Sequence, residues 1–220
     1  MTTQTFSTGA LRIKPEHVFL AMGYKSSREV DEYTRQQTEA LLNEAAGKLH
    51  PSACVETRNG TVEKGNLILG EQLFHPGETI TGQLENASLF HVFIATVGKE
   101  FETWEKQEDD PLRSYIADAI GSCVAERCVT ELHRRIRQQL PRNWGKTLHF
   151  SPGHCHWDVA EQQQLFNLFP ASFNLVTLTD SFLMFPVKSV SGVIGTGENV
   201  TVKSTPCQLC LKKDCFRRLS

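Results

Sequence analysis

The chain has 220 residues, of which 40% are hydrophobic and 22% are charged, a composition typical of globular proteins. The formal net charge of −2 provides no general attraction for nucleic acid, so we expect no nucleic-acid partner. No run of about 18 apolar residues occurs, and the N-terminal segment has no apolar stretch of signal-peptide length. We therefore expect a cytoplasmic protein with no membrane span and no membrane partner.

The first half of the chain predicts a helix followed by strands. Residues 27–49 favour a helix that stops before Pro51, because one face collects a common set of side chains: Val30, Thr34, Thr38, Leu41, Leu42, Ala45 and Leu49. Residues 66–74 and 88–98 have the composition of strands bounded by Gly, Pro and Asn. The second of these is apolar at nearly every position, which predicts that both of its faces are covered.

A long helix is predicted from Pro111 to about Leu140. Asp109 or Asp110 can cap it, and proline suits the first helical position. Apolar residues recur at helical spacing, namely Leu112, Tyr115, Ile116, Ala119, Ile120, Cys123, Val124, Leu132 and Ile136. Cys123 and Cys128 lie within this helix, and we interpret both as small buried core residues rather than metal ligands.

The last third of the chain predicts one more helix and two more strands. Asp158 and Glu161 have the spacing of a capping box, and the helix that follows ends by Pro170. Residues 173–180 and 182–197 then favour strands joined as a hairpin. Because the order has no regular strand-helix-strand rhythm, the sequence predicts an α+β fold with a mixed, largely antiparallel, bent sheet flanked by helices.

The segment "HFSPGHCHWD", residues 149–158, combines three histidines and a cysteine with a Pro-Gly turn. In an extended segment, His154 and His156 would face one way and Cys155 the other. Two imidazoles can begin a zinc site, which needs three or four ligands, while the simpler interpretation is a polar loop. A Cys-His catalytic pair is disfavoured, because such pairs usually come from segments far apart in sequence.

Three cysteines near the end of the chain raise the chance of a metal site. Cys207 and Cys210 form a C-x-x-C pair, Cys215 follows, and Cys155 or a nearby histidine could complete the ligand set. The sequence therefore allows zinc or an iron-sulfur cluster. Surface thiols or a reversible disulfide within C-x-x-C explain the same pattern.

A third interpretation of residues 149–158 is a pocket built from the backbone. Pro152 fixes its own φ, and Gly153 has no Cβ, so a ligand can approach the main-chain polar groups closely. Such a turn suits a nucleoside or an amino acid. The glycines of "GVIGTG" lack the order of a dinucleotide-binding loop and do not open a helix, so a Rossmann-type site is disfavoured.

The segments "HFSPGHCHWDVAEQQQLFNLF", "LTDSFLMFPVKSVSGVIG" and "CQLCLKKDCFRR" resemble the activation domain of vitamin B12-dependent methionine synthase, in its short stand-alone form. The resemblance runs from about residue 85 to the end. It implies three parts: an N-terminal region, residues 1–84, packed into the same domain, an activation-domain-like core, residues 85–206, and a cysteine-containing tail, residues 207–220.

The family binds S-adenosylmethionine and presents its methyl group to cob(II)alamin, while a flavodoxin-type donor supplies an electron. The resemblance therefore implies a module for the reductive remethylation of a cobalamin-dependent methyltransferase. The chain is too short for a corrinoid domain of its own and lacks the Asp-x-His-x-x-Gly motif, so we expect cobalamin to be held by a partner. Alternative functions are a metal or iron-sulfur redox protein and a non-catalytic small-molecule-binding module.

The family loop Arg-x-x-x-Gly-Tyr matches this chain only in part. His149 stands where the arginine is expected and His154 where the tyrosine is expected, whereas Gly153 matches. The resemblance implies an S-adenosylmethionine site formed by Glu126, His149, Phe150, Pro152, Gly153, His154, Ser191 and Gly192. Histidine makes one hydrogen bond to a carboxylate where arginine makes two, and it is charged only when protonated. We therefore expect a lower, pH-dependent affinity for the ligand.

Overall fold

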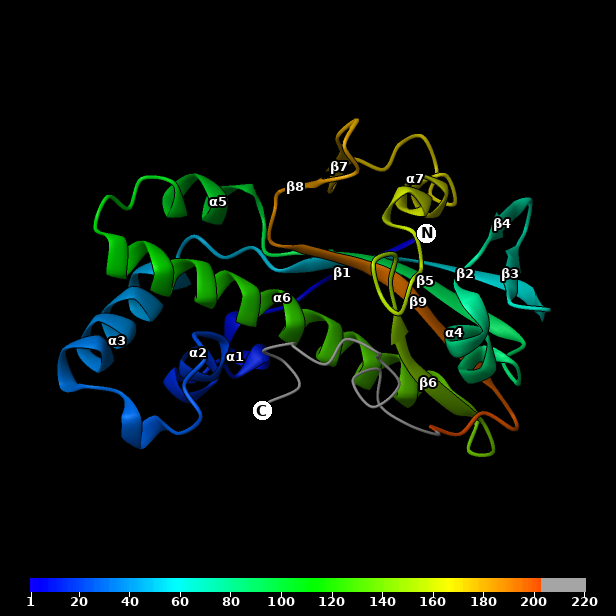
Figure 1. Ribbon diagram of the computed structural model, residues 1–220, viewed down its shortest axis with the longest axis horizontal. Helices are drawn as coiled ribbons and strands as arrows, with labels where there is room; N and C mark the ends of the chain where they lie inside the picture. Colours follow the sequence, from blue (N-terminus) through cyan, green and yellow to red (C-terminus); the bar gives the residue numbers. More distant parts are fainter. Residues whose placement is uncertain (203–220) are drawn as a thin grey trace.

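The computed structural model describes residues 1–202. In this part of the chain the main sheet has seven strands, each antiparallel to its neighbours (Figure 1). The strand order is β4-β3-β2-β5-β9-β6, and β1 pairs with β2 at one end. These strands are β1 (Thr2–Thr5), β2 (Ser52–Glu63), β3 (Asn66–Leu69), β4 (Gln72–Phe74), β5 (Leu89–Thr96), β6 (Gly145–Phe150) and β9 (Ser189–Gly197). The predicted α+β class with an antiparallel sheet is confirmed.

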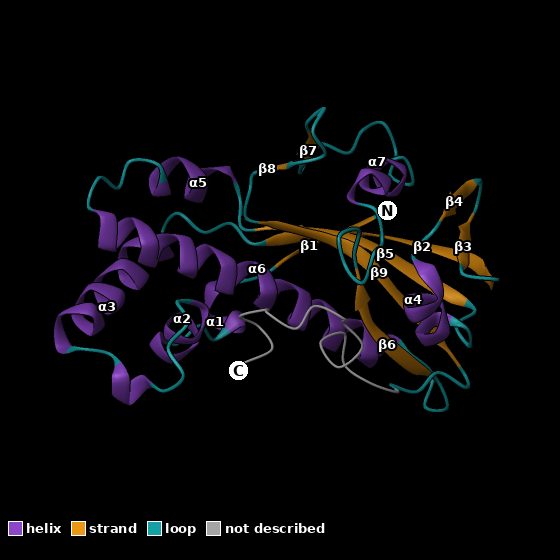
Figure 2. Ribbon diagram, in the orientation of Figure 1, coloured by secondary structure: helices purple, strands orange, loops and turns teal. Residues whose placement is uncertain are grey.

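Helices cover the sheet on both faces (Figure 2). One face packs against α1 (Thr8–Leu11), α2 (Pro15–Ala21), α3 (Glu32–Ala46), α5 (Lys99–Glu105) and α6 (Pro111–Gln139). The other face packs against α4 (Gly77–Leu84), α7 (Gln162–Phe166) and the loops around α7 and the small hairpin of β7 (Thr177–Leu178) and β8 (Met184–Phe185). Two short 3₁₀ helices, Ser27–Glu29 and Val159–Glu161, precede α3 and α7.

The central strand β5 contributes to both cores. Phe93 and Ala95 face the core under α6, whereas Phe90, Val92 and Ile94 face the core under α4 and α7. All five side chains are fully buried, as alternation along a strand between two covered faces requires. The prediction that both faces of this segment are covered is confirmed.

The predicted helices are confirmed with two corrections. Helix α6 begins at Pro111 after Asp110, whose side chain accepts a hydrogen bond from the N–H of Arg113. Asp158 caps the 3₁₀ turn that leads into α7 by accepting from the N–H of Ala160, but the Glu161 side chain bonds Trp157 and His75 and does not close the expected capping box. The helix expected over residues 27–49 is shorter, however, because Asp31 caps it by accepting from the N–H of Thr34. Residues 27–29 form a separate 3₁₀ turn, and α3 ends at Ala46.

Two predicted strands are each divided in the structure. Residues 66–74 form the hairpin of β3 and β4, because Gly70 takes a left-handed turn conformation with φ 59°. Residues 182–197 contain β8, which pairs with β7 as expected, and then β9, which belongs to the main sheet. The predictions that each segment forms a single strand are therefore wrong.

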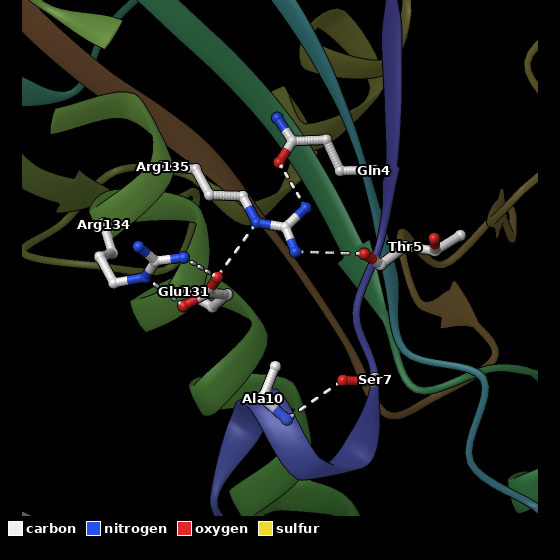
Figure 3. Close-up of polar contacts among 7 residues, drawn as sticks. All are labelled: Gln4, Thr5, Ser7, Ala10, Glu131, Arg134 and Arg135. Atoms are coloured by element: carbon white, nitrogen blue, oxygen red, sulfur yellow. Dashed lines mark hydrogen bonds and ion pairs between the residues drawn. The ribbon is translucent and has the colours of Figure 1, made fainter. Parts of the chain in front are cut away.

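A polar cluster around the carboxylate of Glu131 connects the long helix to the N-terminal strand (Figure 3). Glu131 of α6 accepts from Arg134 at 2.6 and 2.7 Å and from Arg135 at 3.1 Å. Arg135 also donates to the side-chain oxygen of Gln4 and to the carbonyl of Thr5. Nearby, the Ser7 hydroxyl caps α1 by accepting from the N–H of Ala10 (Figure 3). The cluster thus joins β1 to the C-terminal part of α6.

This cluster predicts a loss of stability in acid. The hydrogen bonds from Arg134, and then those from Arg135, lower the pKa of Glu131 to about 2 from its ordinary value of 4.5. Its contribution, about 2 kcal/mol after allowance for screening at the half-exposed Arg134, is present above pH 4.5 and is lost as the pH falls toward 2. Urea unfolding at pH 7 and pH 2.5 should show a stability gap between the wild type and Glu131→Gln that narrows in acid to about a quarter of its size. The exposed control Glu71→Gln should show no gap at either pH, and an undiminished Glu131→Gln gap at pH 2.5 would contradict the assignment.

Candidate functional site at the end of strand β6

The segments that the sequence analysis placed at one site lie side by side. Strand β6 pairs with β9, so that His149 is opposite Ile194 and Phe150 is opposite Val193 (Figure 1). Directly after β6, the hydroxyl of Ser151 donates to the main-chain carbonyl of Ser191. The turn that begins at Pro152 therefore starts against the strand that carries Ser191 and Gly192.

The turn itself differs from the extended segment that was expected for residues 154–156. Cys155 and His156 have left-handed backbone conformations, with φ 46° and 75°, so the side-chain alternation of a strand does not apply. The N–H of Gly153 donates to the carbonyl of Trp157 at 2.7 Å, and that of His154 donates to the carbonyl of Ser151 at 2.9 Å. The N–H groups of Gly153 and His154 are therefore already hydrogen-bonded within the turn. The expectation that they would face a ligand is corrected accordingly.

Ser191 and Gly192 lie inside the contact between the two strands. Ser191 is 2% exposed, and its hydroxyl donates to Gln162 at 3.3 Å. A Cβ on Gly192 would lie 2.7 Å from the carbonyl oxygen of Phe150 and 2.8 Å from the Ser151 hydroxyl. Both residues hold the turn against β9, and direct contact of either with a ligand stays a prediction.

The polar side chains that gather beside the turn are imidazoles. The ring of His149 lies 5.6 Å from the ring of His133 on α6 and 6.0 Å from that of His154, measured between centroids. The ring of Phe93 packs against the ring of His149 in a T-shaped contact, with the two centroids 6.0 Å apart. Burial, together with the nearby positive charges, lowers the pKa of His133 to about 3, so that this ring is neutral at pH 7.

Lys146, near the start of β6, lies beside this group of imidazoles. Its Nζ lies 2.9 Å from Nδ1 of His133, and both side chains are half-buried. Sequence reasoning missed Lys146 and His133. A helix residue and a strand residue thirteen positions apart share no motif, and only the packing of α6 on β6 brings them together.

Glu126 has a different setting. It precedes His133 by seven residues on α6, which is about 10 Å along the helix axis. It lines a cavity of about 220 Å³ between α2 and α6, together with Cys123, Arg127 and residues of α2. A second cavity of about 520 Å³ lies beside Pro51, Thr96 and Gly98. The turn after β6 lines neither cavity. Glu126 therefore does not share either of these cavities with the other predicted ligand residues.

The cysteines of α6 are core residues, as predicted. Cys123 and Cys128 are 9% and 0% exposed, and burial raises the pKa of their thiols to about 11 and about 12. The half-buried Cys155 packs against the core under α4 and α7. Within residues 1–202 no group of three or more His, Cys, Asp or Glu side chains is arranged to hold a metal ion. The predicted ligands Cys207, Cys210 and Cys215 lie outside the described residues, so the metal site stays a prediction.

Comparisons with known proteins identify the family. The family model of the vitamin B12 dependent methionine synthase activation domain matches residues 79–203. Among solved structures, the crystal structure of the MetH reactivation domain bound to AdoHcy matches with a TM-score of 0.68 and 16% identity, covering 91% of this chain and 79% of that one. No curated protein sequence matches the chain. The family match spans more than half of the chain, which therefore belongs to the activation-domain family, and the structural match shows that it has the same fold.

Among the described residues, no helix combines the length and the apolar character that a passage through a lipid bilayer requires.

Proposed function

We propose that this protein binds S-adenosylmethionine beside the turn after β6 and supports the reductive remethylation of a cobalamin-dependent methyltransferase, such as methionine synthase, in the cytoplasm. The family match carries the proposal, because residues 79–203 include every residue of the predicted ligand site. The contact of Ser151 with Ser191 supports it, since the two segments that the site requires are adjacent. A crystal structure with the same fold contains AdoHcy, the demethylated form of the proposed ligand.

The proposed reaction does not require a residue of this chain to act as a general acid or base. S-adenosylmethionine would supply the methyl group, the corrinoid would come from a partner, and a flavodoxin-type protein would supply the electron. The residues beside the turn would then bind the ligand and orient it, which by itself can account for a large part of a rate enhancement. A half-exposed row of imidazoles next to an aromatic edge is suited to a polar ligand with a planar base.

His149 is the residue on which the ligand contact can be tested directly. We expect His149→Ala to weaken S-adenosylmethionine binding by about tenfold, the usual effect of losing one hydrogen bond to a charged group. The exposed His50→Ala serves as a matched control, because His50 pairs with Glu100 on another part of the surface. Isothermal titration calorimetry measures both affinities. Equal losses in the two variants would contradict a ligand-binding role for His149.

The activity itself requires a cobalamin-loaded partner. The protein, S-adenosylmethionine, a reductant and a cob(II)alamin-loaded methyltransferase would be mixed without oxygen, and the cobalt spectrum would be followed. We expect methylcobalamin to form only when all four components are present. Ligand binding without any spectral change would instead favour a non-catalytic binding module, and metal analysis of the same sample tests the zinc and iron-sulfur alternative.

A further inference from the structure

We propose that Lys146 supplies the positive charge that holds the carboxylate of the ligand, with His133 and His149 completing an anion site between β6 and α6. The inference rests on the proposed function and deepens it. The family loop motif points to His149, whereas the geometry points to Lys146, which no motif contains.

A β-bulge turns Lys146 toward the same side of the sheet as His149. The two residues are three positions apart, so in a regular strand their side chains would point to opposite faces. Their partners on β9, Thr196 and Ile194, are only two positions apart, so β6 contains one extra residue. Consequently Lys146 and His149 both face His133 on α6.

The bulge is held by buried hydrogen bonds. Thr147 is 2% exposed, and its hydroxyl accepts from the N–H of Gly195 at 3.0 Å and donates to the carbonyl of Leu148 at 2.6 Å. Because these bonds engage main-chain groups on both β6 and β9, the bulge is part of the packed sheet. Bulges recur next to binding sites because they re-aim a side chain in this way.

Within residues 1–202, no carboxylate neutralises the charge of Lys146. Its nearest polar partner, His133, is neutral at pH 7, and no acidic side chain forms an ion pair with Lys146 among residues 1–202. Burial, with a smaller effect from Arg137, lowers the pKa of Lys146, which means that the ammonium group is under-solvated and repelled. An anion beside it would relieve both effects. A half-exposed ammonium beside His133, whose ring lies 5.6 Å from that of His149, can offer a carboxylate one charged contact and further hydrogen bonds.

Two ligands that differ only in the carboxylate separate this proposal from others. Calorimetry would be carried out with S-adenosylmethionine and with decarboxylated S-adenosylmethionine on the full chain. For Lys146→Met we expect a loss of about 10- to 100-fold for S-adenosylmethionine, the effect of removing a charged hydrogen bond, and little change for the decarboxylated ligand. Lys146→Arg should retain most of the affinity, and the exposed Lys25→Met serves as the control.

The outcomes distinguish the two levels of the proposal. If Lys146→Met weakens both ligands equally, or neither, Lys146 does not hold the carboxylate, although S-adenosylmethionine binding by the wild type would still stand. If the wild type binds neither ligand, the proposed function fails as well. Circular dichroism of each variant shows whether it is folded, and Lys146→Arg tests the charge in a second way that does not depend on the stability of the methionine variant.

Discussion

Replacing Trp157 with alanine should destabilise the protein by about 3–5 kcal/mol, the usual cost of emptying the place of a buried aromatic ring. Trp157 is 1% exposed and is among the largest fully buried side chains of the structure. Its ring meets Phe74 edge to face at 5.9 Å, and its indole N–H donates to Glu161 at 2.7 Å. Glu161 in turn binds the main chain and the ring of His75, so Trp157 connects the turn after β6 to strand β4 and the segment that follows it.

The same substitution should weaken the ligand site, because Trp157 closes the turn. Its carbonyl accepts from Gly153 and its N–H donates to His154. These main-chain bonds survive in the alanine variant only while the turn stays in place, and the buried indole is what holds the turn there. We therefore expect S-adenosylmethionine affinity to fall together with the free energy of unfolding.

Urea unfolding and calorimetry on two variants check this expectation. Trp157→Phe keeps most of the apolar contact but loses the bond to Glu161 and part of the buried ring, so it should cost about 2 kcal/mol, less than the alanine variant. An alanine variant as stable as the phenylalanine variant would mean that the ring contributes little packing. An alanine variant that is destabilised but binds the ligand normally would show that the turn does not depend on its buried anchor.

The elements that could be predicted from the sequence are those fixed by neighbours along the chain. Helix α6 has its cap at Asp110, proline at its first position and a continuous apolar face, all of which are local. Strand β2 was missed, although it is the longest strand described. Residues 52–63 include Arg58, Asn59 and Gly60, which weaken the appearance of a strand, and this segment is stabilised by pairing with β1, β3 and β5.

The candidate site shows the same division. The resemblance placed the turn after β6 beside the strand that carries Ser191, and in the structure Ser151, at the start of that turn, contacts Ser191. The positions of Lys146 and His133 did not follow from any pattern. A bulge changes the face of every residue beyond it without an unambiguous mark in the sequence. The left-handed backbone of Cys155 and His156 was missed because neither residue is a glycine, the usual occupant of that conformation. Sequence patterns thus located the turn but could not give the directions of its side chains.

Gly192→Ala should test whether the β6–β9 contact is required for the site. The added methyl group would lie 2.7 Å from the carbonyl oxygen of Phe150, 2.8 Å from the hydroxyl of Ser151 and 3.2 Å from the ring of Phe93. The first of these atoms belongs to the main chain of a paired strand and cannot rotate away. We expect a destabilisation of about 3 kcal/mol from overpacking, and a loss of the hydrogen bond from Ser151 to Ser191 as the strands move apart.

Gly82→Ala provides the matched control, because Gly82 lies within helix α4 and a Cβ there would meet no atom within 4 Å. That variant should be more stable by about 0.5–1 kcal/mol, since alanine favours a helix more than glycine does. Thermal unfolding gives the stabilities and calorimetry the affinities for S-adenosylmethionine. If Gly192→Ala were as stable as the wild type and bound the ligand equally well, the close approach of the two strands would not be needed to form the site. If it lost affinity while remaining stable, the defect would lie in the position of the turn, because the fold as a whole would have accommodated the methyl group.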